Sequence, residues 1–246
     1  MRDKIYFASD FHLGMSDRLE NLARERKIIS WLDIIKKDAK TIYFLGDIFD
    51  FWFEYHKVIP KGFVRFLGKI AELSDSGINT YFFVGNHDMW MGDYLSDEIG
   101  IKIFYKPMIV EEYGKKIYLG HGDGLGKGDY MYKFLRLIFK SKICRWLFAR
   151  LHPNFSFTIA HAWSRKSRKK NNTINSVEQI NKDTLFEFCK AMQESNPIDY
   201  YIFGHTHNPI KIELKDKSKY INLGDWITHY TYAVMDKHSI KLETYK

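Results

Sequence analysis

Cysteine and proline are scarce in this 246-residue chain. The two cysteines, Cys144 and Cys189, lack the paired spacing of a disulfide framework, a metal knuckle or a redox motif, so the sequence excludes these classes. Only five prolines are present, and no linker, repeat or low-complexity stretch divides the chain. Because 45% of the residues are apolar and can bury a sizeable core, we expect one domain over residues 1–246.

Long apolar runs are also absent. No window approaches the roughly 18 uninterrupted apolar residues that a membrane-spanning helix needs. The chain enters a strand-like run by residue 4, without the charged and apolar regions of a signal peptide. We therefore expect a cytoplasmic protein, either free or peripherally attached to a membrane.

What the sequence does contain is a recurring β-branched and aromatic run, which predicts strands at residues 5–8, 41–45, 80–84, 117–119 and 200–203. Helical periodicity over residues 19–37 and 61–73 separates the first three runs. Residues 220–245 read again as strands, and residues 171–195 as a helix. This alternation is typical of a layered α/β fold.

Each of the five predicted strands ends in a short block rich in metal-ligand residues: Ser9–His12, Gly46–Asp50, Gly85–Asp88, Gly120–Asp123 and Gly204–His207. Ligands of α/β sheets bind beyond the carboxyl ends of the strands, so we expect the five blocks to converge. Four blocks begin with glycine, and we expect each glycine to let the backbone turn sharply there.

This mixture of carboxylates, an amide oxygen and imidazoles suits divalent ions such as Mn, Fe or Zn. Two such ions can clamp a phosphoryl group, stabilise its developing charge and lower the pKa of a bridging water into the neutral range. The blocks therefore predict a two-metal phosphoesterase in which hydroxide, and not a side chain, is the nucleophile.

The order and content of the blocks resemble the calcineurin-like metallophosphoesterase superfamily from residue 5 to about residue 225. The resemblance implies an α/β/β/α sandwich and a ligand set for each ion. The first ion would be held by Asp10, His12, Asp47 and His207. The second ion would be held by Asp47, Asn86, His121 and His205, with Asp47 bridging the pair.

By the same resemblance, Asn86 and His87 are the catalytic residues of the third block. His87 would face the phosphate and help the leaving oxygen depart, either as a general acid or as a hydrogen-bond donor. Asp50 and Asp88 have two interpretations, as carboxylates that orient ligand imidazoles or as caps of their own loops.

Residues 125–172 differ in composition from the rest of the chain. They carry twelve Lys or Arg residues against one acid, so this segment has a charge of +11 and the remaining residues a charge of −3. Aromatic and aliphatic residues are interleaved with the cations. Helical spacing predicts two stripes: Lys133, Arg136 and Lys140 on one, and Leu135, Ile138 and Phe139 on the other.

Four interpretations of this segment remain open. A basic amphipathic helix can lie on an anionic membrane. It can also wall a pocket for acyl chains, or pack on the core with a solvated basic face. A nucleic-acid surface is the fourth, and we disfavour it because most aromatics have core spacing beside Leu and Ile, whereas a nucleic-acid groove needs them exposed.

The His-Gly-Asp block, the basic-aromatic insertion and the strand end Leu223–Trp226 narrow the resemblance to the UDP-2,3-diacylglucosamine diphosphatases of lipid A biosynthesis. That family implies a helical lipid-binding cap at about residues 125–172, two Mn²⁺ ions and the cytoplasmic surface of the inner membrane. The substrate would be a UDP-linked diacyl sugar, hydrolysed at its α-phosphate to UMP and lipid X. Its implied substrate contacts are Tyr132, Ser167, Arg168, Lys169 and Lys170.

One position departs from the best-known branch of that family, which carries Arg where this chain has His87. An Arg contact to the diphosphate must therefore be replaced here. The alternative functions are a metal-dependent phosphodiesterase or nuclease that needs no acyl pocket, and a non-catalytic scaffold. The scaffold is disfavoured because a binding module has no need of the complete ligand set.

Overall fold

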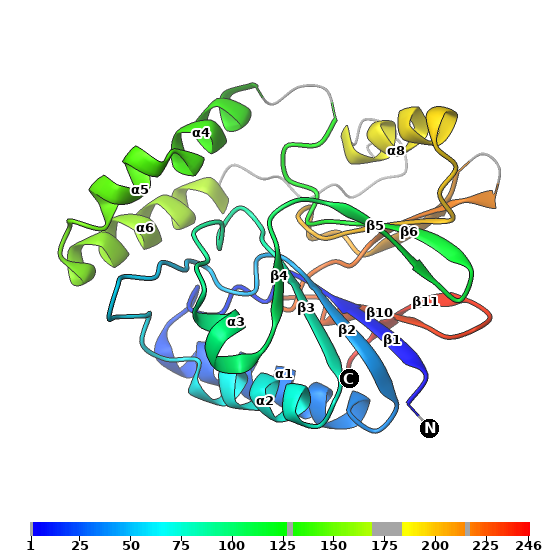
Figure 1. Cartoon of the computed structure of the whole chain (residues 1–246), viewed down its shortest axis with the longest axis horizontal. Helices are drawn as coiled ribbons and strands as arrows, with labels where there is room; N and C mark the ends of the chain where they lie inside the picture. The colour runs from blue at the N-terminus through cyan, green and yellow to red at the C-terminus, as the bar shows by residue number, and fades with distance from the viewer. Residues whose placement is uncertain (1, 127–129, 169–183, 215–216) are drawn as a thin grey trace.

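The computed structural model describes residues 2–126, 130–168, 184–214 and 217–246, whose strands form two sheets (Figure 1). Within these residues the first sheet has the strand order β11-β10-β1-β2-β3-β4. Its strands are β1 (Lys4–Ala8), β2 (Ala39–Leu45), β3 (Asn79–Phe83), β4 (Lys102–Phe104), β10 (Thr231–Met235) and β11 (Ile240–Thr244). Strands β1 to β4 are parallel, and β10 and β11 are added antiparallel beside β1.

The second sheet has the order β5-β6-β7-β9-β8 among the described strands. These are β5 (Met108–Glu112), β6 (Lys115–Leu119), β7 (Tyr200–Phe203), β8 (Ile210–Glu213) and β9 (Lys219–Asn222). The three central strands, β6, β7 and β9, are parallel, and β5 and β8 pair antiparallel at the edges. All five strands predicted to precede a ligand block are confirmed, within one or two residues at each end.

Three clusters of buried side chains fill the spaces between four layers, which are helices, the two sheets and a further helix. The first cluster, around Trp31, joins α1 (Arg18–Ile35) and α2 (Val64–Asp75) to the first sheet. The second fills the space between the sheets, with Leu45 and Ile202 among its members. The third, around Phe186, joins the second sheet to α8 (Thr184–Ser195). The predicted α/β/β/α sandwich is confirmed (Figure 1).

The helix boundaries follow from local chemistry. Helix α1 begins after Asp17, whose carboxylate accepts the backbone N–H groups of Leu19 and Glu20. Helix α2 begins three residues later than predicted, because Gly62 and Phe63 adopt positive φ angles of 111° and 57°, which a right-handed helix cannot include. Helix α3 (Tyr94–Ile99) precedes β4 and was not predicted. Of the helix predicted over residues 171–195, residues 171–183 lie outside the described residues.

In the described residues between β6 and α8 the chain forms three helices, which we call the cap helices: α4 (Tyr130–Lys140), α5 (Lys142–Phe148) and α6 (Pro153–Arg168). They project beyond the ends of both sheets (Figure 1, green). The helical character predicted for residues 125–172 is therefore confirmed for the part that the structure describes. No helix in the described ranges is long and apolar enough to cross a membrane.

Candidate metal centre

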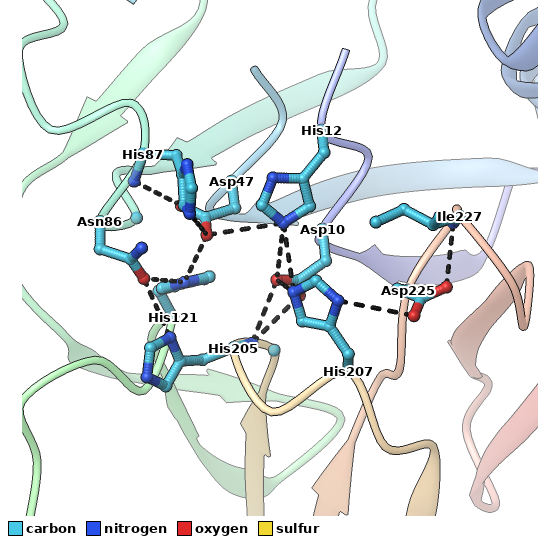
Figure 2. Close-up of polar contacts among 12 residues, drawn as sticks. Asp10, His12, Asp47, Asn86, His87, His121, His205, His207, Asp225 and Ile227 are labelled. Carbon is cyan, nitrogen blue, oxygen red and sulfur yellow. Dashed lines mark hydrogen bonds and ion pairs between the residues drawn. The ribbon is translucent and has the colours of Figure 1, made fainter. Parts of the chain in front are cut away.

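The seven predicted metal ligands lie together where the carboxyl ends of β1, β2, β3, β6 and β7 meet (Figure 2). They are Asp10, His12, Asp47, Asn86, His121, His205 and His207. Backbone hydrogen bonds hold the blocks together, from the Asp10 N–H to the Gly46 carbonyl and from the Gly204 N–H to the His121 carbonyl, both 3.0 Å. The two sheets therefore contribute to a single cluster.

Four donor atoms converge at one side of the cluster. The Asn86 Oδ1 atom lies 3.1 Å from His121 Nε2 and 2.9 Å from His205 Nδ1. The Asp47 Oδ2 atom lies 3.2 Å from the same His121 nitrogen. Separations of about 3 Å between donors fit around one ion with bonds of about 2.0–2.2 Å. These residues match the predicted ligand set of the second ion.

A second group of donors surrounds His207. Its Nε2 atom lies 3.2 Å from Asp10 Oδ1 and 3.2 Å from His12 Nε2. The His12 Nε2 atom is 3.8 Å from Asp47 Oδ2, the oxygen that also approaches His121. The residues present therefore fit two divalent ions, and Asp47 lies where a bridging carboxylate is needed.

The electrostatics of the cluster point the same way. Burial lowers the pKa of His207, but Asp10 and then Asp225 outweigh it and raise that pKa to about 10. Burial is likewise outweighed at His121, where Asp47 holds the pKa well above its usual value. The nearby histidines in turn hold the carboxyl pKa values of Asp10 and Asp47 low, against the effect of burial. These buried pairs share protons that divalent cations would replace on binding.

Five of the seven proposed ligands have left-handed backbones. The φ angles are positive at Asp10 (56°), His12 (44°), Asp47 (53°), His205 (70°) and His207 (56°). Non-glycine residues rarely adopt this conformation, and such strain gathers at functional sites. The sharp turns that direct these side chains into the cluster are thus made by the ligands themselves.

The glycines of the blocks have a different role from the one expected. Gly46 does turn the chain, with φ of 86°, but Gly85 and Gly204 do not have positive φ. A Cβ atom on Gly85 would lie 2.2 Å from Asp47 Oδ1, and one on Gly204 would lie 2.2 Å from Asp10 Oδ2. The expectation of a glycine turn was wrong at these two positions, where glycine leaves room for a carboxylate of another block.

His87 lies at the edge of the cluster. Its Nε2 atom is 4.0 Å from Asp47 Oδ2 (Figure 2). Its Nδ1 atom is 3.0 Å from the Asp50 carbonyl oxygen. A carbonyl only accepts, so Nδ1 carries the hydrogen and the Nε2 atom of the neutral ring carries none. Burial also lowers the pKa of His87. A general-acid role would therefore require a second proton on this ring.

Asp50 connects the cluster to the cap. Its Oδ1 atom is 3.4 Å from His12 Nδ1, so it contacts a ligand imidazole as one of our two interpretations predicted. Both carboxylate oxygens also accept from the Ser164 hydroxyl of α6 at 2.9 Å, and Ser164 Oγ is 3.2 Å from His87 Nδ1. Sequence reasoning missed Ser164, because one serine in a basic helix carries no recognisable signal.

Asp88 contacts backbone N–H groups and not an imidazole. Its Oδ2 atom accepts from Ile48 at 2.9 Å and Phe49 at 3.4 Å, and its Oδ1 atom accepts from Gly85 at 2.7 Å. Burial and the neighbouring Asp47 raise its pKa to about 7. The loop-capping interpretation holds for Asp88, which fastens the second block to the third.

In the cap helix α4, two of the three cations of the predicted basic stripe bind the fourth block and the segment that follows it. Lys133 donates to the Gly126 carbonyl at 2.6 Å, and the Arg136 guanidinium binds the carboxylate and carbonyl of Asp123 at 3.2 and 3.0 Å. Many apolar side chains of the cap helices, and that of Leu151 between α5 and α6, are instead exposed to solvent. The exposed ones are Tyr130, Phe134, Leu137, Ile138, Ile143, Trp146, Leu147, Leu151, Phe155 and Ile159. The argument that the aromatics of this segment belong to the core was therefore wrong for several of them.

Aromatic side chains fix the cap helices to the loops of the second and third blocks. Phe148 of α5 lies 4.9 Å from Phe53 and 4.7 Å from Trp90 between ring centroids. Phe157 of α6 lies 5.4 Å from Phe51. The Trp90 indole also donates to the Phe139 carbonyl at 2.6 Å. The loop that follows Asp47 thus contacts the cap through both packing and Asp50.

Three of the five predicted substrate contacts lie in the cap helices. Tyr132 is in α4, and Ser167 and Arg168 are in the last turn of α6. Lys169 and Lys170 lie outside the described residues.

The model of the calcineurin-like phosphoesterase family matches residues 3–209. A UDP-2,3-diacylglucosamine hydrolase of Porphyromonas gingivalis is 40% identical and aligns with 99% of this chain and 98% of its own. One from Histophilus somni is 31% identical, over 91% of this chain and 92% of its own. Among solved structures, a phosphoesterase from E. coli is 14% identical, with a TM-score of 0.45 over 99% of this chain and 100% of its own.

A match of this length, together with the complete set of ligand blocks, shows a metal-dependent hydrolase. The chain belongs to the calcineurin-like phosphoesterases and, within them, to the family of the UDP-2,3-diacylglucosamine hydrolases.

Proposed function

We propose that this protein hydrolyses the diphosphate bond of UDP-2,3-diacylglucosamine and releases UMP and 2,3-diacylglucosamine 1-phosphate, lipid X. The observation that carries the proposal is the 40% identity to a hydrolase of that name over almost the whole of both chains, cap helices included. A phosphoesterase cluster beside a cap with an apolar outer surface is consistent with a substrate that has a diphosphate and two acyl chains.

Two divalent ions, which we propose to be Mn²⁺, would supply an ionised water at neutral pH and neutralise the charge that develops on the phosphoryl oxygens. The side chains of this chain have two tasks. Asp10, His12, Asp47 and His207 would hold one ion, and Asp47, Asn86, His121 and His205 the other. His87, whose Nε2 atom lies 4.0 Å from Asp47 Oδ2, would bind the phosphate in its doubly protonated form, in place of the arginine of other branches.

We propose that the cap helices bind the acyl chains and contact the cytoplasmic surface of the inner membrane. Leu137 is 71% exposed and Ile143 70% exposed, and burying a side chain of this kind contributes about 1.5–3 kcal/mol. Cations beside this surface, including Lys142 and Arg150, would meet anionic headgroups. Tyr132, Ser167, Arg168, Lys169 and Lys170 remain our proposed contacts to the sugar and phosphate.

The test is mass-spectrometric turnover of UDP-2,3-diacylglucosamine with Mn²⁺, beside the soluble diester bis-p-nitrophenyl phosphate. Selective release of UMP and lipid X is expected, with Asp47→Ala as the control that removes metal-dependent chemistry. Turnover of the soluble diester alone would refute the lipid substrate and leave the phosphoesterase intact.

A phosphodiesterase or nuclease is the second candidate, because exposed aromatics lie beside cations on the cap. Trp146, for example, is 56% exposed, and the Arg150 guanidinium lies 4.9 Å above its ring. Binding of a nucleic acid here would weaken steeply with salt, whereas an acyl-chain contact would not. Oligonucleotide binding measured between 50 and 200 mM salt separates the two.

A further inference from the structure

Asp225, which sequence reasoning assigned no role, lies in the turn after β9. Its side chain is buried, and its Oδ1 atom accepts three backbone N–H groups, from Ile227 at 2.9 Å, Thr228 at 2.6 Å and His229 at 3.1 Å. The other oxygen, Oδ2, lies 3.5 Å from Nδ1 of His207 (Figure 2). The two oxygens therefore have separate tasks, one in the turn and one toward the metal centre.

The His207 ring lies between two carboxylates. Its Nδ1 atom faces Asp225 and its Nε2 atom faces Asp10 Oδ1 at 3.2 Å. A hydrogen on Nδ1 directed at Asp225 leaves the Nε2 lone pair for an ion. The His207 side chain is 29% exposed, whereas that of His12 is 1% exposed, so packing restrains His207 much less.

The turn that carries Asp225 is itself anchored to the centre. The Trp226 N–H donates to the Asp10 carbonyl at 3.0 Å. The Asn222 side-chain amide donates to the carbonyl of Gly204, the residue that begins the fifth block. Hydrogen bonds therefore join the three segments that carry the Asp225 carboxylate, the His207 imidazole and the Asp10 ligand.

We propose that Asp225 is a positioning residue that fixes the tautomer and orientation of His207 and thereby sets the affinity of one metal position. The assignment rests on the proposed two-metal site. Carboxylates that orient metal-binding imidazoles commonly change metal affinity or activity by about 10–100-fold when they are removed.

The variant Asp225→Asn isolates this role. Asparagine keeps an Oδ1 acceptor for the turn, but it replaces Oδ2 by an amide that presents hydrogens to the Nδ1–H group. We expect Mn²⁺ to bind about tenfold or more weakly at one of the two positions and unchanged at the other. The measurement is Mn²⁺ titration of the full chain in competition with a chelator, with thermal denaturation of the metal-free protein as a check on folding.

Asp236→Asn is the matched control. The Asp236 carboxylate accepts the N–H groups of His238 and Ser239 at 2.8 and 2.9 Å in a similar turn, at the other end of β10. Equal Mn²⁺ affinity in the wild type and Asp225→Asn would overturn the proposal, as would equal losses in the two variants. A wild type that bound no Mn²⁺ would instead contradict the two-metal site on which the proposal rests.

Discussion

Charged side chains are usually exposed and apolar side chains usually buried, and the metal centre and the exposed surface of the cap helices each depart from one half of this rule. At the metal centre charged groups are buried, with Asp10 and Asp47 at most 2% exposed, while on the cap apolar side chains such as Leu137 face solvent. Buried charges persist when they are paired or bind metals, and large exposed apolar patches mark interaction sites. The buried cluster is therefore suited to divalent ions, and in our proposal the exposed cap surface meets an apolar ligand or membrane.

The two regions also differ in how they are built. The metal centre is made of short turns with left-handed backbones, cross-linked through Gly46, Gly204 and Trp226. The cap helices contact the loops around the centre through polar pairs such as Arg136 with Asp123, and through aromatic packing such as that of Phe148 on Trp90. In our proposal the metal centre provides the chemistry and the cap helices provide substrate selection.

The largest expected effect is that of Asp47→Ala, because this carboxylate lies between both groups of donors. Losing the bridge between two ions removes several kcal/mol of transition-state stabilisation, so turnover should fall by about a thousandfold or more. The fall should be the same for the lipid substrate and for bis-p-nitrophenyl phosphate. Near-wild-type activity on either substrate would contradict the two-metal assignment.

Changing the cap should affect only one of the two substrates. In the double variant Leu137→Gln/Trp146→Gln, lost apolar burial should weaken sedimentation with anionic vesicles and kcat/KM for the lipid by about 10–100-fold. Turnover of the soluble diester should not change. The control is Leu19→Gln/Val64→Gln, which alters two side chains on α1 and α2 that are 79% and 74% exposed. Equal effects of the two double variants would show that the apolar side chains of the cap do not bind the lipid specifically.

Removing a hydrogen bond between the cap helices and the metal centre should have a smaller effect. Ser164→Ala removes a hydrogen bond to the Asp50 carboxylate, which in turn contacts His12. A hydrogen bond to a charged group contributes about 1.5–3 kcal/mol, so kcat should fall by about tenfold for both substrates, with KM little changed. Ser156→Ala is the control, since Ser156 is also buried in α6 but donates to the carbonyl of His152, the residue just before that helix. A change in KM for the lipid alone would assign Ser164 to substrate binding instead.

Sequence reasoning predicted the metal centre far better than the cap. Each ligand block follows a strand, and the parallel order of strands alone brings Asp10, Asp47 and Asn86 to one edge. In the cap, periodicity identified helices but not which face turns inward. That choice depends on tertiary partners such as Asp123, which binds Arg136, and no pattern within the helix encodes it.

The supporting residues were the hardest to predict. Asp50, Asp88 and Asp225 are all buried aspartates near ligands, yet their contacts differ. Asp50 contacts a ligand imidazole, and Asp88 caps backbone N–H groups of two loops. Asp225 contacts a ligand imidazole and also caps its own turn. Their roles depend on the direction of single N–H groups in neighbouring loops. Local sequence does not determine those directions.

Asp88→Asn tests the loop-capping role of Asp88, and the quantity to measure is the stability of the fold and not the activity. Both oxygens of Asp88 accept backbone N–H groups, so the new amide must oppose one of the donors from Ile48, Phe49 or Gly85. The variant should lose about 1–3 kcal/mol of unfolding free energy, or about 2–10 °C in Tm. The control Asp17→Asn should be nearly neutral, because Asp17 caps α1 with one oxygen and asparagine caps equally well. Equal Tm values for the two variants would mean that Asp88 does not fasten the second block to the third.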